Sequence, residues 1–235
     1  MKKKILVACL CVALAVLTIA GTTLAYLTSK DTVTNTFTVG NVQIKLDEAK
    51  VDEMGKIDPT ANARVQANTY KLIPGHTYTK DPTIHVDEKS ENCFIRAKVT
   101  LNNADKWITI AANYADGKIE NIIKGTDDNL WWVSNPAVDP TANTVTYTFV
   151  YKNESKAESL KRVWQNGVDG KDLVLFNQIV IPGNLTGKEL TDVANTTITV
   201  VAEAIQADGF AESSNDAAAA AEAYSKAMAA LDAAK

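Results

Sequence analysis

The sequence has few of the residues from which catalytic or metal sites are usually built. Its 235 residues include two histidines, His76 and His85. No His-Glu-x-x-His segment places two imidazoles on one helix face, and no Gly-x-Ser-x-Gly segment presents a nucleophilic serine. The histidines lie nine positions apart, and we expect them at the surface or in turns rather than as zinc ligands. The sequence therefore predicts no catalytic, metal-binding or cofactor-binding residue.

Cysteine is equally scarce, which excludes a disulfide framework. Two of the three cysteines, Cys9 and Cys11, lie in an N-terminal apolar stretch that we expect to be removed. Cys93 then has no partner for an intramolecular disulfide, so the stability of the fold must come from a hydrophobic core. Because Cys93 is followed by Phe94 and Ile95, we expect its side chain to be a buried apolar group rather than a reactive thiol.

Positive charge is also in short supply. The chain has 24 Lys and Arg against 28 Asp and Glu, a formal net charge of -4. Removal of residues 1–25 takes three lysines and no acids, and the formal charge becomes -7. This balance gives no electrostatic footprint for nucleic acid or for an anionic membrane surface.

The N-terminus carries a long apolar run that is typical of export. Three lysines, Lys2 to Lys4, precede apolar and small residues from Ile5 to Ala20. The pattern predicts a signal peptide over residues 1–25, cleaved between Ala25 and Tyr26. A retained anchor is the alternative, because the uncharged stretch is long enough to span a bilayer.

Beyond residue 40, apolar and polar residues alternate with a period of two, which is typical of half-buried strands. Turn-forming segments such as Ile73-Pro74-Gly75, Lys80-Asp81-Pro82 and Ile181-Pro182-Gly183 separate the runs. Many short strands bounded by turns favour an antiparallel architecture. The sequence predicts an all-β fold over residues 41–210, a jelly-roll-like antiparallel β-sandwich with short helical insertions. The strands are expected near residues 42–46, 94–99, 145–151, 174–181 and 198–205.

Two segments have helical patterns. Residues 154–164 carry Leu160, Val163 and Trp164 at helical spacing. Residues 211–235 form an alanine-rich tail, in which Glu222 and Lys226 are spaced to pair along a helix. Because its apolar stripe has few large side chains, we expect the tail helix to be weakly docked or projecting, with a coiled partner helix as the alternative.

Paired acids and a tryptophan pair are the remaining candidates for binding. The acid pairs Asp47-Glu48, Asp87-Glu88 and Asp127-Asp128 lack the calcium-loop pattern, and we expect them on the solvated surface. Adjacent strand residues point to opposite faces, so one residue of Trp131-Trp132 can face outward and stack on sugar or peptide. The apolar neighbours on either side favour packing of both indoles.

The segment between the predicted cleavage site and the first strand has its own alternation. Gly40-Asn41 interrupts the pattern, and beyond this point the apolar residues have the opposite parity, which requires a bulge, turn or strand end. Residues 26–40 are therefore predicted to form a separate strand arm. It either folds back as an edge strand of its own subunit or pairs with another chain. The arm alternates threonines with four residues that form its second face: Val33, Asn35, Phe37 and Val39.

Several short segments occur together from the signal to about residue 210. They are the signal end Thr-Leu-Ala followed by Tyr26-Leu27-Thr28, Asn35 to Val42, Ile73-Pro74-Gly75 with Lys80-Asp81-Pro82, Phe94-Ile95-Arg96, Ile179 to Gly183, and Ala204 to Phe210. This combination resembles the TasA/camelysin family of exported proteins, which are processed by a signal peptidase of the SipW type.

The resemblance implies a secreted protein of a Gram-positive-type bacterium, located in the extracellular matrix or at the cell surface. It implies a jelly-roll subunit that self-associates into biofilm-matrix fibres, in which the mature N-terminus of one subunit completes the sheet of its neighbour. No cofactor, nucleic acid or, after signal cleavage, membrane is expected as a partner. Camelysin-like members are also described as cell-surface metallopeptidases, which is the alternative function.

Overall fold

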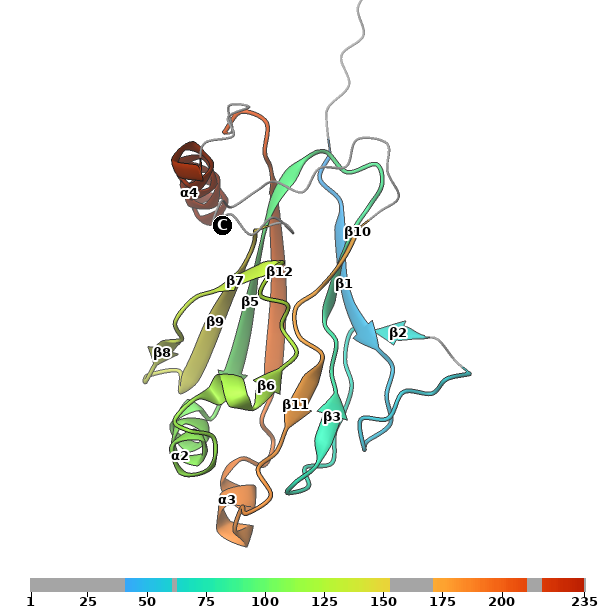
Figure 1. The fold of residues 1–235 in the computed structure, drawn as a ribbon, viewed down its shortest axis with the longest axis vertical. Coiled ribbons are helices and arrows are strands. Elements are labelled where there is room, and N and C mark those ends of the chain that lie inside the picture. The colour runs from blue at the N-terminus through green and yellow to red at the C-terminus, as the bar shows by residue number, and fades with distance from the viewer. Residues whose placement is uncertain (1–40, 61–62, 153–170, 211–216, 235) are drawn as a thin grey trace, which may run out of the picture. The chain divides into compact units, whose positions relative to one another are not determined.

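The chain folds mainly into antiparallel strands arranged in two layers (Figure 1). The computed structural model describes residues 41–60, 63–152, 171–210 and 217–234. The first layer contains β1 (Ile44–Ala49), β2 (Arg64–Val65), β3 (Thr77–Thr79), β4 (Thr83–Val86), β6 (Ile123–Lys124), β10 (Lys171–Val174) and β11 (Gln178–Val180). The second layer contains β5 (Cys93–Asn102), β7 (Trp131–Val133), β8 (Ala137–Asp139), β9 (Thr144–Tyr151) and β12 (Ile198–Gln206).

The first layer consists of two short sheets that continue one another. Their strand orders are β10-β4-β1-β2 and β3-β11-β6. Pro82 has no N–H to donate, and the segment Lys80 to Pro82 separates β3 from β4. Backbone bonds still cross the interruption, from Lys80 N to Asn177 O (3.1 Å) and from Leu175 N to Pro82 O (3.0 Å). The predicted turn at Lys80-Asp81-Pro82 is therefore an interruption within a continuing path.

The second layer has the order β12-β5-β9-β7, with β8 also paired to β9. Its longest registers join β5 to β12 and β5 to β9, all antiparallel. In β9 the predicted alternation is confirmed, since Val145, Tyr147 and Phe149 are buried while the intervening threonines are half-buried.

One hydrophobic core joins the two layers. Trp131 on β7 is buried in this core, with its ring edge-on to Phe149 at a centroid distance of 6.1 Å. Its indole N–H donates to the carbonyl of Val174 in the opposite layer (2.7 Å). The core also contains Ile84, Val86 and Leu173 from the first layer and Ile95, Val99 and Leu101 from the second. The prediction of an all-β antiparallel sandwich is confirmed.

Helix α2 (Ala104–Tyr114) was not expected from the sequence. Its Trp-Ile-Thr-Ile segment contains residues that favour strands, which masks the helical spacing of Trp107, Ile110 and Ala111. These three side chains are buried, and the Trp107 indole donates to Thr196 Oγ1 (3.0 Å). Tertiary packing therefore outweighs local propensity here. The predicted helix over residues 154–164 lies outside the described residues.

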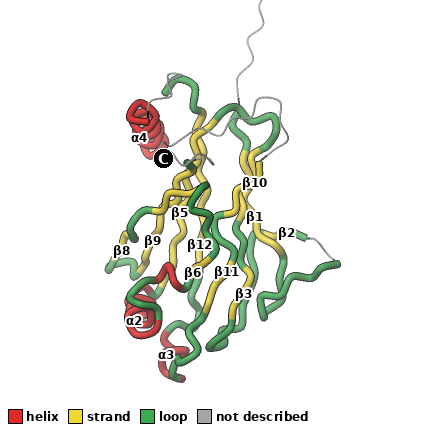
Figure 2. Tube along the Cα trace, viewed as in Figure 1, coloured by secondary structure: helices red, strands yellow, loops and turns green. Residues whose placement is uncertain are grey.

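Two shorter elements and α2 connect the strands (Figure 2). The 3-10 helix η1 (Ile119–Asn121) precedes β6. Helix α3 (Gly187–Asp192) begins with a capping box, in which Thr186 accepts from the Glu189 backbone while the Glu189 carboxylate accepts from Thr186 N (2.8 Å).

The C-terminal helix α4 (Ala217–Ala233) packs on the outer face of the second layer. Ala223, Ala227 and Met228 are buried in a small cluster with Phe94 and Ala207. The predicted Glu222–Lys226 pair is present at 2.7 Å.

An ion pair that the sequence did not reveal strengthens the docking of α4. Arg96 on β5 donates to both carboxylate oxygens of Asp232, at 3.1 and 2.6 Å, and its Nε donates to Glu203 at 2.7 Å. Of the two expectations for this helix, weakly docked or projecting, the structure shows docking, and the Arg96–Asp232 contact adds to the small apolar stripe on which the expectation was based.

Loss of the Arg96–Asp232 contact should loosen α4 without unfolding the sandwich. Arg96 keeps Glu203 as a partner in Asp232→Ala, and the Asp232 carboxylate is half exposed, so the expected loss is about 1 kcal/mol. Hydrogen exchange of the α4 amides should accelerate while exchange in β5 and β9 is unchanged. Glu222→Ala, which breaks an exposed pair on the same helix, is the control and should leave α4 docked. Equal protection of α4 in Asp232→Ala and the parent protein would contradict this role.

Candidate functional site

The side of the sandwich formed by β1 and β12 is incompletely covered. Among the described strands, β12 pairs with β5 alone, and residues 44–47 of β1 pair with β4 alone. Side chains that point inward from these two edges are only partly buried, whereas those of β4 and β5 are buried. The partly buried residues are Val42, Ile44 and Leu46 beside Ile198, Val200, Ala202 and Ala204. Two neighbouring edges therefore present apolar side chains and one free ladder side each.

A cleft with a volume of ≈ 580 Å³ lies beside these strands. This volume is within the range of ordinary binding pockets, so the cleft could hold several side chains. We name it the β1/β12 cleft, because Glu48 near the end of β1 and Ile198 at the start of β12 both line it; most of its wall comes from residues 66–72 and 193–197. Apolar side chains such as Leu72, Leu101 and Ile179 line it together with polar groups from residues 66–70 and 194–197.

A buried ion pair forms part of the wall of this cleft. Lys80 Nζ lies 2.5 Å from Glu48 Oε2, and the Asn68 amide donates to the other carboxylate oxygen at 2.9 Å. The ammonium also lies 5.8 Å from the ring centroid of Tyr70. Burial, together with the charge of Glu48, raises the pKa of the Tyr70 hydroxyl. The wall is thus held by groups whose polar atoms are already paired.

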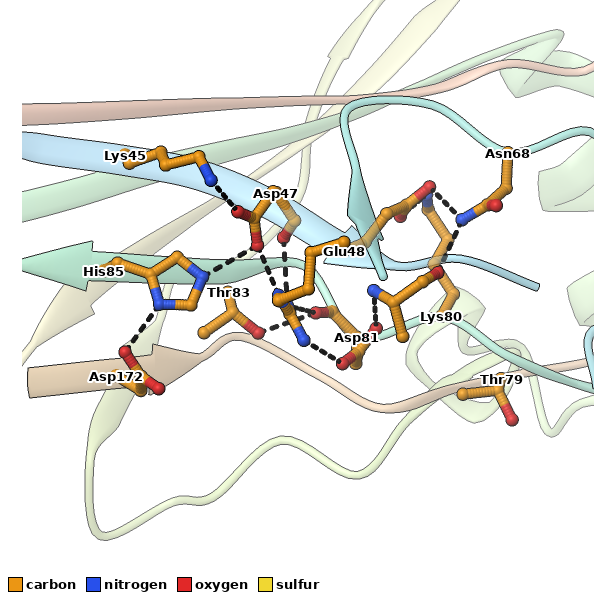
Figure 3. A network of polar contacts seen from close by, with 12 residues as sticks. Lys45, Asp47, Glu48, Asn68, Thr79, Lys80, Asp81, Thr83, His85 and Asp172 are labelled. Atoms are coloured by element: carbon orange, nitrogen blue, oxygen red, sulfur yellow. Dashed lines mark hydrogen bonds and ion pairs between the residues drawn. The ribbon is translucent and has the colours of Figure 1, made fainter. Parts of the chain in front are cut away.

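A second polar network covers the outer face of β1, β4 and β10 (Figure 3). Asp47 receives the Lys45 ammonium at 2.8 Å, the His85 Nε2 at 2.7 Å and the Arg64 guanidinium. His85 Nδ1 lies 2.5 Å from Asp172 Oδ1. The imidazole therefore links the strand after the arm, β1, to β10 through two carboxylates.

The charged form of the buried Asp47 carboxylate is stabilised by the basic groups of this network. Burial by itself raises the pKa of the carboxyl, but hydrogen bonds from Lys45, Arg64 and His85 outweigh it and hold the pKa well below its ordinary value of 3.8. The carboxylate is therefore charged throughout the neutral and mildly acidic range.

The structure corrects three expectations. Asp47 and Glu48 are buried rather than solvated, because basic side chains distant in sequence surround them. His85 is a half-buried member of the network rather than a surface or turn residue. Trp132 is 53% exposed, while Trp131 is buried as predicted, so packing of both indoles was wrong.

Other expectations are confirmed. Asp87, Glu88, Asp127 and Asp128 are exposed, and His76 is half-buried directly after the turn at residues 73–75. Cys93 is fully buried, and burial raises the pKa of its thiol to about 11.

The prediction about metal ligands stays a prediction. Within the part of the chain that the structure describes, no group of three or more His, Cys, Asp or Glu side chains is suited to a metal ion.

The other predicted site residues cannot be placed. Ala25 and Tyr26 at the cleavage site lie outside the described residues, as do Val33, Asn35, Phe37 and Val39 of the arm. None of the helices in the described ranges is long and apolar enough to cross a membrane.

Removal of the Asp47 charge should lower stability at neutral pH and alter the response to acid. Asp47→Asn leaves three basic partners without their carboxylate, and the unfolding free energy at pH 7 should fall by about 2 kcal/mol. Because the folded-state pKa is depressed, the stabilisation by Asp47 is present above the ordinary carboxyl pKa and is lost as pH falls below it.

Urea unfolding between pH 7 and pH 3 measures both effects. The parent protein should lose stability in acid more steeply than Asp47→Asn. Asp172→Asn is the control, because the Asp172 side chain is 68% exposed and Asp47 keeps its partners. Parallel pH curves for the parent protein and Asp47→Asn would show that the network does not stabilise the fold.

Comparison with known proteins assigns a family resemblance to the N-terminal part of the chain. Residues 1–87 match the family model described as camelysin metallo-endopeptidase. This range contains β1 to β4, and with them Asp47, Glu48, Lys80 and His85. No curated protein and no solved structure matches the chain significantly. Residues 1–87 are therefore similar to the camelysin family, which agrees with the resemblance expected from the sequence.

Proposed function

We propose that the protein is a secreted structural subunit of biofilm-matrix fibres. In this proposal the arm, residues 26–40, of one subunit pairs with the exposed edges of the next. The observation that carries the proposal is the incomplete cover of the core at β1 and β12, where seven inward-pointing apolar side chains are only partly buried.

An added strand fits the chemistry of this edge. A strand satisfies the unpaired N–H and C=O groups along an edge, and its alternate side chains fill the apolar surface beneath. The nine residues of β12 offer an edge of about 30 Å, and the arm is longer than that edge. Full burial of a Phe or Val side chain contributes about 1.5–3 kcal/mol, so Val33, Phe37 and Val39 together supply a useful driving force.

The sequence of β12 does not protect its edge against pairing with another strand. Natural sheets usually protect long edges with charges, prolines or bulges. In β12 the one charged residue, Glu203, is bonded to Arg96 on the outer face and does not block the inner side. The edge is thus suited to pairing with a strand.

Secretion and processing complete this proposal. Cleavage between Ala25 and Tyr26 by a SipW-type signal peptidase would free the arm, and a retained signal would leave it tethered. The matrix or the cell surface is the proposed location, the partner is another copy of the chain, and no cofactor is required.

A cell-surface metallopeptidase is the second candidate, because the family model that matches residues 1–87 carries that description. Electron microscopy of the purified mature protein, with metal content measured on the same sample, separates the candidates. We expect fibres without stoichiometric zinc and no casein cleavage that a chelator abolishes. Chelator-sensitive cleavage lost in His76→Ala or His85→Ala would favour the peptidase.

Deletion of the arm should abolish elongation. Protein lacking residues 26–39, and full-length Phe37→Asp, should remain folded monomers by circular dichroism and sedimentation, because the residues beyond 41 that the structure describes form a hydrophobic core among themselves. A synthetic peptide of residues 26–39 should bind the deleted protein, and the same peptide with Asp at position 37 should not. Unfolding of the deleted protein would place the arm in its own core, and fibres from it would exclude the arm as the link.

The acceptor edge can be tested at two adjacent residues of β12. Val200 points inward and is partly buried, whereas Val201 points outward and is 47% exposed. Val200→Asp should block elongation because a charge would face the inserted strand, and Val201→Asp should not. Thermal unfolding establishes that both variants are folded. Equal elongation by both variants would remove β12 from the acceptor site, and a block in both would indicate a contact on the outer face instead.

A further inference from the structure

A second cavity lies at the opposite edges of the two layers. Its volume is ≈ 380 Å³, and η1, β6, β7 and β9 contribute to its walls. We name it the β6/β7 pocket. In the strand orders, β6 is the last strand of the first layer and β7 the last of the second, so this pocket is separate from the β1/β12 cleft.

The pocket contains a buried hydroxyl group that the fold does not satisfy. Tyr147 is 3% exposed and lines the pocket, and its hydroxyl makes no hydrogen bond of ordinary length within the described residues. A buried hydroxyl without a partner is destabilising, and such groups are uncommon in native proteins. A ligand that accepts a hydrogen bond at this position would remove the deficit.

The Tyr147 hydroxyl is a donor. Burial raises the pKa of the phenol, and so do the charge of the Glu120 carboxylate and its weak contact with the hydroxyl, so the proton is retained at neutral pH. The group that it can best bind is therefore an oxygen acceptor on a ligand.

Of the remaining lining residues, the apolar ones are buried or half-buried and the charged ones are exposed. Ile123 is buried, Phe149 is buried and Val133 is half-buried, which provides apolar walls. Glu120, Asp128 and Lys124 are exposed, so two carboxylates and one ammonium lie at the mouth. The mouth has an excess of negative charge, which favours a cationic group on a ligand.

One corner of the pocket is held in shape by the backbone. Gly125 has φ +85°, and a Cβ added there would lie 1.9 Å from Asn177 Oδ1. Only glycine allows this approach without displacing Asn177. The close packing of Gly125 against the Asn177 side chain thus fixes this corner of the pocket.

We propose that the β6/β7 pocket binds a small aromatic amine with an oxygen on its ring. The ring lies between the apolar walls, the oxygen accepts from Tyr147, and the ammonium pairs with Glu120 and Asp128. The size suits this class, since ligand pockets have volumes from about 300 Å³ upward. The site does not depend on the arm or on assembly.

Three probes of equal shape test each contact separately. Tyramine carries both the ring oxygen and the amine, 2-phenylethylamine lacks the oxygen, and 4-hydroxyphenylacetate replaces the amine by a carboxylate. NMR titration of the mature protein should show tyramine binding most tightly, with shifts at β6, β7 and β9. Removal of one hydrogen bond weakens binding about fivefold, which is the expected difference between tyramine and 2-phenylethylamine.

Two variants and a control complete the experiment. Tyr147→Phe should abolish the preference for tyramine over 2-phenylethylamine, and its thermal midpoint should be unchanged or higher because an unsatisfied hydroxyl is removed. Glu120→Gln should weaken both amines and strengthen the carboxylate probe. Tyr114→Phe, which removes a hydroxyl bonded to Glu189 on α3, should leave all three affinities unchanged.

The proposal is overturned if none of the probes binds at millimolar concentration, or if all three bind equally. It is also overturned if Tyr147→Phe keeps the tyramine preference. A lower thermal midpoint of Tyr147→Phe would mean that the hydroxyl has a structural partner, which would contradict the premise of the site.

Discussion

Contact between the inward faces of the two layers is the interaction on which the rest of the structure depends. Without a disulfide among the described residues, the layers are held by apolar burial around Trp131, whose indole also bonds to the opposite layer. A sandwich of this kind covers the centre of its own core but leaves the two open sides to be closed by other means. One of the two cavities described above begins where β1 ends and β12 starts, and the other lies at β6 and β7.

Buried charges hold the edge elements in position. Asp47 joins β1 to basic groups from β2 and β4, and Arg96 joins β5 to α4 and β12. Replacing one partner of such a network is costly, because the remaining charges stay buried without compensation. These networks therefore fix where the edges lie, although they add little net stability compared with an apolar contact.

The two sides differ in what can fill them. The β1/β12 side is long and apolar, and one ladder side of each strand has no partner among the described strands, which suits an added strand. The β6/β7 side is a compact pocket with a buried hydroxyl and a charged mouth, which suit a small molecule. Assembly at one side and ligand binding at the other are compatible within a single subunit.

Local pattern alone determined much of the fold. The period of two in residues 144–151 and 198–206, and the turn segments between such runs, predicted the antiparallel sandwich, because side-chain alternation is a property of each strand by itself. The neighbours of Cys93 likewise predicted its burial. The TasA/camelysin resemblance came from short motifs between the signal and about residue 210, and the family match over residues 1–87 agrees with its N-terminal part.

Tertiary structure decided what depends on partners distant in the chain. From the sequence, Asp47 and Glu48 were predicted to be surface acids. In the structure Arg64 and His85 pair with Asp47 and Lys80 pairs with Glu48, and no local sequence pattern encodes those pairings. Helix α2 exists because its apolar face is buried, despite residues that favour strands. The docking of α4 depends on Arg96, 136 positions from Asp232. The sequence determined the strands and their inward faces, whereas only the assembled sandwich decided which charges are buried and which edges remain open, because burial is a property of the whole fold.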